Sequence, residues 1–186
     1  SFEMYQTLAT IVDNPYDAVT VNRVSVHAEG RETVSEWELG GLSVNQGDGW
    51  QDVTPSTVIT VAPGDTLQLR ATLRAYQNSH DKRTVDLSVH VPATAASGSG
   101  QVLVAGGADL AALGPDTSTV TSVADLLKAL NAVPHNDDLV AQVSVPDPSG
   151  SATITRNHHV RLKKVTRGTL ALQLNVVIPC GDCSGD

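Results

Sequence analysis

The sequence predicts a mainly β protein: an antiparallel β-sandwich of immunoglobulin-like type, with one short inserted helix and a short N-terminal helix. Residues 57–91 alternate apolar and polar side chains along three expected strands, and a period of two places one row in a core and the other in water. Further short alternating segments follow, separated by Gly, Pro, Asn and Asp turn signals. A convincing helical pattern occurs late in the chain, at residues 122–131.

The stretch 57–91 predicts a strand at 57–62, a turn at Pro63-Gly64-Asp65 and a second strand at 67–75. A polar loop at 76–83 leads to a third strand at 85–91. These strands indicate a hairpin with one buried face, packed on a second layer. The expected core includes Leu67, Leu69, Leu73, Val85, Leu87, Val89, Leu170, Leu172 and Leu174.

The N-terminal part predicts a helix at residues 2–13 that ends before Asn14-Pro15. This helix is too short to be stable alone, so we expect it to dock on the sheet. Residues 18–28 predict a strand with a β-bulge near Asn22 and Arg23, where the apolar phase slips by one residue. Residues 33–39 predict another strand, which Gly40-Gly41 interrupts before a loop at 45–49.

In the C-terminal half, residues 101–105 predict a short strand and residues 108–121 a loop. Ser122, with Asp125 three residues later, resembles a capping box and begins the predicted helix at 122–131. Strands are then expected at 139–145, 152–155, 159–165 and 170–178.

The length of 186 residues is sufficient for one large β domain with its own core. We expect residues 1–179 to form a single sandwich domain, in which a subdivision would fall near 92–108. The polar residues 180–186 are expected to be a flexible tail that carries a Cys-x-x-Cys motif.

The composition excludes some classes of binding partner. The net charge is −8 and no basic run is present, which argues against a nucleic-acid partner. No apolar run approaches the ~20 residues that a membrane-spanning helix needs, and no signal peptide is recognisable. We expect no transmembrane segment, and the pattern leaves the oligomeric state open.

Cys180 and Cys183 are the two cysteines of the chain. Their spacing fits a local disulfide, a redox dithiol or half of a zinc site. We expect a disulfide between them if the protein is exported. A zinc site would need further ligands, for which His135, His158 and His159 are the candidates.

No other pattern indicates catalysis or a cofactor. His158 and His159 are neighbours on an expected strand, so they face opposite sides and should not share a metal. No acidic loop has the oxygen-ligand spacing of an EF-hand, and no Gly-x-Ser-x-Gly motif is present. We therefore expect no enzyme, no metal and no cofactor.

Three scattered aromatic residues are candidates for stacking on a ligand: Trp37, Trp50 and Tyr76. Stacking of this kind would suit a carbohydrate or a cell-wall polymer. Packing inside the protein is the alternative role for such residues.

The order of segments is informative as a set. A helix leads into the segment DNPYDAVTVNRVSVHAEG. This is followed by VAPGDTLQLRATLRAYQNSHDKRTVDLSVHVPATAASGSGQVLVAGG and then by SVADLLKALNAVPHNDDLVAQV. Over residues 4–145 this layout resembles the region after the peptidase core in large secreted bacterial proteins related to the stage IV sporulation protein B type serine peptidases. The resemblance implies an accessory β-sandwich module, located outside the cell or at its surface. It implies no catalytic residue here, because no position matches the nucleophile motif of that family.

These observations lead to one functional expectation and two alternatives. We expect a non-catalytic accessory or protein-interaction module of a larger exported bacterial protein. Its partner would be another protein or a preceding domain of the same parent chain. The alternatives are a carbohydrate- or cell-wall-binding module, and a fragment of a serine peptidase whose catalytic domain lies upstream.

Overall fold

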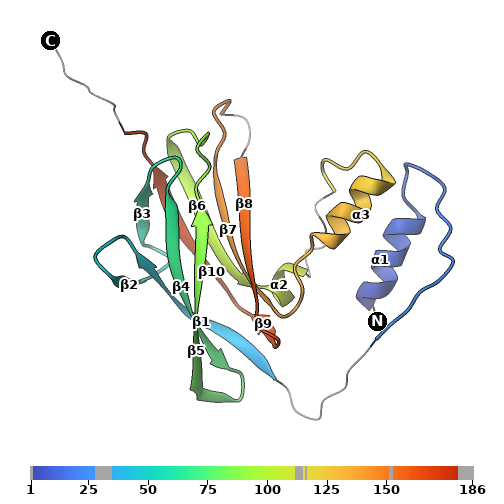
Figure 1. The fold of residues 1–186 in the computed structure, drawn as a ribbon, viewed down its shortest axis with the longest axis horizontal. Helices are drawn as coiled ribbons and strands as arrows, with labels where there is room; N and C mark the ends of the chain where they lie inside the picture. Colours follow the sequence, from blue (N-terminus) through green and yellow to red (C-terminus); the bar gives the residue numbers. More distant parts are fainter. Residues whose placement is uncertain (1, 28–34, 112–114, 116, 151–152, 180–186) are drawn as a thin grey trace.

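The computed structural model of the chain describes residues 2–27, 35–111, 115, 117–150 and 153–179 (Figure 1). These residues form two five-stranded sheets packed face to face, with three short helices outside them. The predicted mainly β sandwich is confirmed. The sheets are mixed rather than purely antiparallel, because two of the described strand pairs are parallel.

The first sheet has the order β2-β1-β4-β5, and β9 pairs with the start of β1. The hairpin of β4 (Thr66–Ala75) and β5 (Asn78–His90) is the one predicted from residues 57–91, with a shorter loop than expected. Gly40 does not end β1 (Glu36–Asn45), because the strand continues through a bulge between Leu39 and Gly41. The two short strands of this sheet are β2 (Trp50–Val53) and β9 (Val165–Arg167).

The second sheet has the order β3-β10-β6-β7-β8. It contains β3 (Val58–Val61), β6 (Gly98–Gly106), β7 (Asp138–Pro146), β8 (Thr153–Arg161) and β10 (Thr169–Val176). The strands expected at 152–155 and 159–165 are mainly one strand, β8. Alternation does not break between them, so pairing with β7 continues along the whole length.

The core lies between the sheets and is built almost entirely from Val, Leu, Ile and Ala. Eight of the nine predicted core residues are buried, and Leu170 is half-buried against the same cluster. Burying such a row removes apolar surface from water, which stabilises the folded state by roughly 25 cal/mol for each Å² of apolar surface buried. The buried predicted residues are Leu67, Leu69, Leu73, Val85, Leu87, Val89, Leu172 and Leu174.

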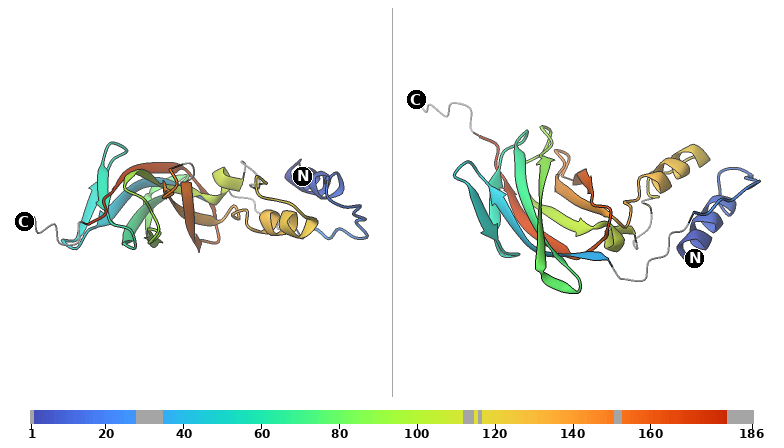
Figure 2. Two further views of the ribbon diagram at one scale, coloured as in Figure 1. Left: turned by 90° about the horizontal axis from the view of Figure 1, so that it is seen from above. Right: turned by 60° about the horizontal axis from the view of Figure 1, so that its bottom comes forward.

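The helices lie beside one end of the sandwich (Figures 1 and 2). Helix α3 (Val123–Asn131) matches the predicted helix, and the hydroxyl of Ser122 accepts a hydrogen bond from the backbone of Asp125 at 3.1 Å. Helix α1 (Phe2–Val12) is also confirmed, but it packs against α3 and not against a sheet as expected. A third helix, α2 (Gly107–Ala111), occupies part of the stretch predicted as loop.

The predicted strand at 18–28 is wrong for the described part, residues 18–27. These residues have no regular secondary structure and no strand partner among the described residues. Val21, Val24 and Val26 are exposed. Strand formation needs a neighbouring backbone, and the segment runs beside the helices, away from both sheets (Figure 1).

Candidate functional site

Strand β8 forms one edge of the second sheet. It pairs with β7 along its full length, from Asp138 opposite Arg161 to Pro146 opposite Thr153. In the part of the chain that the structure describes, no strand pairs with its other side. The backbone groups that point to that side are available to a further strand.

The core-facing row of β8 is only partly covered. Ile154 and Val160 are half-buried and pack against the core, and His158 in the same row is also half-buried. The other long edge strand, β5, differs because its three core residues are buried already. An added strand would therefore cover more apolar surface on β8 than on β5.

The chain around β8 has an unusual charge. Residues 153–167 contain five of the 12 lysines and arginines and none of the 20 acidic residues. The remainder of the chain thus has seven basic residues against 20 acidic ones. Sequence reasoning missed this concentration because it looked for uninterrupted basic runs. A running count of charge along the chain would have found it.

A groove of about 390 Å³ lies beside the outer row of β8, next to the end of α3. Its polar lining consists of Asn131 at the end of α3, His135 just after it, Asp138 at the start of β7, and the outer row of β8. The residues that β8 contributes are Asn157, His159 and Arg161.

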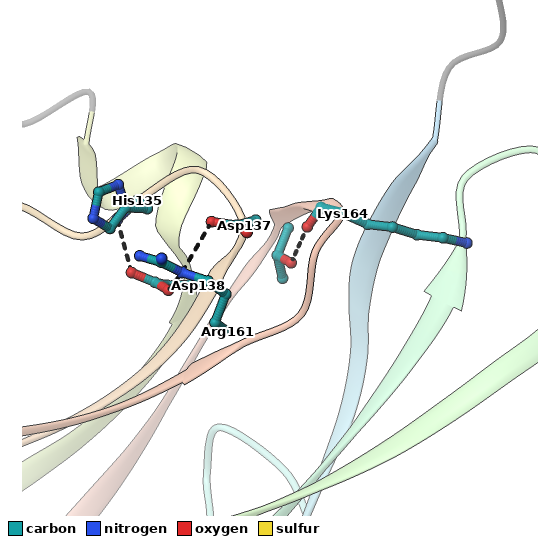
Figure 3. Close-up of polar contacts among 6 residues, drawn as sticks. His135, Asp137, Asp138, Arg161 and Lys164 are labelled. Atoms are coloured by element: carbon teal, nitrogen blue, oxygen red, sulfur yellow. Dashed lines mark hydrogen bonds and ion pairs between the residues drawn. The ribbon is translucent and has the colours of Figure 1, made fainter. Parts of the chain in front are cut away.

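Asp138 is the one acidic residue that lines this groove among the described residues, and its carboxylate is already engaged. Oδ2 accepts a hydrogen bond from the backbone N–H of His135 at 2.8 Å, and Oδ1 lies 3.4 Å from Nε of Arg161 (Figure 3). Arg161 also lies 3.6 Å from a carboxylate oxygen of Asp137, and its side chain stays 56% exposed. These contacts orient Arg161 towards the two carboxylates, while more than half of its side chain stays accessible.

The turn that carries His135 and Asp138 is held firmly in place. Its carbonyl groups accept hydrogen bonds from Leu162 and Thr166, each at 2.8 Å. Gly107 is required there, because a Cβ atom at this position would lie 1.9 Å from the carbonyl oxygen of His135. The groove beside β8 is therefore built on a close-packed junction.

A smaller pocket of about 300 Å³ lies at the end of the sandwich where β1 and β9 pair. It brings together two of the predicted aromatic residues, Trp37 of β1 and Tyr76 of the β4–β5 turn. The polar lining is Glu36, Glu38 and Arg167, and Arg167 Nε lies 3.2 Å from a carboxylate oxygen of Glu36.

The two aromatic rings of this pocket differ in accessibility. Trp37 is 6% exposed and belongs to the core, and the ammonium of Lys164 lies 4.4 Å from the centre of its ring. Figure 3 shows Lys164 extending towards β1 and away from Asp137 and Asp138. The indole N–H of Trp37 is buried without a hydrogen-bond partner among the described residues. Tyr76 is 61% exposed and can meet a ligand directly.

Trp50, the third predicted aromatic residue, lies elsewhere. Its ring stacks on the guanidinium of Arg70 at 4.0 Å, on the outer face of the first sheet. Arg70 also makes a bidentate contact with Asp86, at 2.6 and 2.9 Å. These hydrogen bonds lower the pKa of the Asp86 carboxyl below its ordinary value. The three aromatics therefore do not form one platform.

The histidines and cysteines considered as zinc ligands are not all brought together in the described structure. His135 and His159 share the groove beside β8, whereas His158 faces the other side of that strand. Within the described residues, no group of three or more His, Cys, Asp or Glu side chains could hold a metal ion. Cys180 and Cys183 lie outside the described residues.

No helix in the described part of the chain is long and apolar enough to span a membrane.

No protein-family model matches the chain, and no curated protein or solved structure shows significant similarity to it. The resemblance to the region that follows stage IV sporulation protein B type peptidases accordingly rests on the sequence pattern alone.

Proposed function

We propose that the chain is a non-catalytic protein-interaction module of a larger exported bacterial protein, and that it receives partner backbone at an open sheet edge. The observation that carries this proposal is the nine-residue edge strand β8. Main-chain hydrogen bonds to such an edge give affinity, and side chains at alternate positions give specificity.

The setting of the module comes from the sequence. An immunoglobulin-like accessory domain outside the cell, in a parent protein that also contains a peptidase core, is what the resemblance over residues 4–145 implies. In that setting Cys180 and Cys183 are expected to form a disulfide with each other. Alkylation without reductant, followed by mass spectrometry, tests the pairing, and two modified thiols would exclude it.

An unbiased peptide-display library, selected on the whole chain, tests the interaction function. We expect enrichment of extended peptides that compete with one another for one site. A selected peptide, once bound, should slow amide hydrogen exchange in an edge strand of the chain. The proposal is wrong if selection yields nothing above the background of an immobilised unrelated β-sandwich protein.

The peptidase alternative has a direct test. Activity-based serine and cysteine probes should not label the chain. Stoichiometric labelling that is abolished by one substitution in the folded core would instead identify a catalytic residue and contradict the non-catalytic assignment.

A second candidate function is carbohydrate binding, which the pocket of Trp37 and Tyr76 favours. An exposed aromatic ring beside carboxylates and a guanidinium offers both stacking and hydrogen bonds to a sugar. We expect this function to show as retention on insoluble peptidoglycan, chitin or cellulose that falls several-fold in Tyr76→Ala. Trp50→Ala is the matched control, since that ring lies outside the pocket. Equal retention of all three proteins would exclude the pocket as the site.

A further inference from the structure

The proposed interaction function can be taken one step further, to the site and the chemistry of the partner. We propose that the edge of β8 accepts an extended, acidic segment of a partner protein as an additional strand. In this complex one carboxylate of the segment occupies the groove lined by His135, His159 and Arg161. The inference rests on the proposed function and narrows it.

The choice of β8 follows from a comparison of the sheet edges. β2, β3 and β9 have four, four and three residues, which is too short for a stable ladder with a partner. β5 is longer, but its core-facing residues are already buried. Only β8, among the described edges, combines length with a core-facing row that an added strand would cover.

The core-facing row sets the apolar half of the partner pattern. Ile154 and Val160 are half-buried at the margin of the core. Side chains of neighbouring strands stand about 5 Å apart when they lie directly opposite each other. Apolar residues opposite Ile154 and Val160 would thus extend the core past the two ends of this row, whose middle positions are Arg156 and His158.

The outward-facing side chains of β8 determine where the partner segment should be acidic. Asn157, His159 and Arg161 are exposed on this face, and each donates hydrogen bonds through nitrogen. A Glu or Asp placed opposite His159 would also lie diagonally from Arg161, within reach of its guanidinium. Asp137 and Asp138 already contact Nε of Arg161, at 3.6 and 3.4 Å, so the carboxylate of the partner would share this guanidinium with them. The Arg161 side chain is 56% exposed and can reach it.

Charge on a larger scale favours the same partner. Of the five basic residues at 153–167, Arg156 and Arg161 belong to β8, whereas Lys164 and Arg167 lie at the pocket where β1 and β9 pair. In a chain of net charge −8, basic residues on β8 attract a negative segment to this edge. Lys163 is exposed just beyond β8 and extends the positive region. Affinity should therefore fall as salt rises.

The test uses synthetic peptides as probes of the whole chain. The acidic probe is Ac-Ser-Glu-Val-Glu-Val-Glu-Ser-amide. A second probe replaces each Glu by Lys, and a third is the acidic probe N-methylated at every residue. In calorimetric titrations we expect the acidic probe to bind and the lysine probe to bind at least about 10-fold more weakly. The N-methylated probe should show no binding, since none of its residues offers a backbone N–H to the edge.

A matched pair of variants locates the site. Asn157→Asp with His159→Glu places two negative charges on the outer row of β8, and we expect binding to weaken by about 10-fold or more. Gln173→Glu with Asn175→Asp places the same two charges on β10, in the same sheet but away from this edge. Binding to that control should be nearly unchanged. Thermal melts of both variants establish that each is folded.

Amide hydrogen exchange distinguishes the possible failures. The acidic probe should slow exchange in β8, and the assignment is wrong if the two variants weaken binding equally or if protection appears in β5. If the display selection enriches peptides that are not acidic, the acidic partner is wrong while the interaction function stands. If the selection enriches nothing, the interaction function itself is wrong.

Discussion

Residues 18–27 and strand β10 are both segments in which apolar residues recur at alternate positions, but only β10 forms a strand. β10 lies between β3 and β6, and its Leu172 is 2% exposed. Residues 18–27 have no strand partner among the described residues, and Val26 is 66% exposed.

The difference lies in the continuity of the apolar row. In β10 the apolar residues stay in one phase from Leu170 to Val176, so one whole face enters the core. In residues 18–27 the phase changes after Val21, and neither face is apolar throughout. Strand propensity measures how well a residue fits a pleated, half-buried surface, and it has little effect where no such surface is available.

The largest expected contrast comes from placing one charge in each region. Leu172→Asp buries an unpaired carboxylate and should lower the free energy of unfolding by about 4 kcal/mol or more. Val24→Asp leaves its charge in water and should change it by less than about 0.5 kcal/mol. Urea denaturation measures both. A large loss in Val24→Asp would show that residues 18–27 are packed against something in solution.

A smaller effect is expected for a substitution that destabilises the helices without destabilising the sandwich. Leu126 is the buried residue of α3, and Leu126→Ala should cost about 2–3 kcal/mol locally. Since α1 packs on α3 and the hydroxyl of Tyr16 donates to the carbonyl of Val120 at 2.8 Å, the whole N-terminal part should exchange its amide hydrogens faster. Exchange in β10 should not change. Equal acceleration in β10 would mean that the helices and the sandwich unfold as one unit.

The N-cap of α3 offers a milder change of the same kind. Ser122→Ala removes the hydroxyl that accepts from the backbone of Asp125, and should cost about 1 kcal/mol. Ser122→Thr keeps a hydroxyl that can accept from this N–H and donate to the Asp125 carboxylate, and should recover most of that loss. Circular dichroism and amide exchange of α3 report the effect, and identical behaviour of the alanine and threonine variants would contradict a capping role.

The smallest expected effect depends on pH. Hydrogen bonds from Ser122 and Thr121 lower the pKa of the Asp125 carboxyl, and those from Arg70 lower the pKa of Asp86. A lowered carboxyl pKa contributes stability that is present above the ordinary pKa and is lost as the pH falls through the folded value. NMR titration should find both carboxyls still ionised below their ordinary range. Ser122→Ala should raise the pKa of Asp125 and leave that of Asp86 unchanged.

Local pattern predicted the parts of the fold in which neighbours in sequence are neighbours in space. The β4–β5 hairpin and the capped helix α3 are of this kind, because alternation and capping are encoded within a few residues. The parallel pairs β1–β9 and β3–β10 could not be predicted, because no local signal specifies which distant strand will lie alongside. The placement of α1 on α3 depends on tertiary packing in the same way.

The candidate sites show the same limit. Composition identified Trp37, Trp50 and Tyr76 as residues of interest, but only folding decides that Trp37 and Tyr76 share a pocket while Trp50 stacks on Arg70. The groove beside β8 unites residues that are 24 positions apart, His135 and His159. Its charge was readable from the sequence, whereas its shape was not.

The two parallel pairs also determine when the protein can fold. Val165 to Arg167 complete the first sheet beside β1, and Gln173 to Val176 join β3 to the second sheet. On the ribosome, β1 and β3 must wait for more than a hundred further residues before these parallel neighbours emerge. Contacts of such long sequence separation slow folding and leave strand edges exposed in the meantime. The first sheet lacks the parallel neighbour of β1, and β3 lacks a partner among the described strands, until β9 and β10 have left the ribosome.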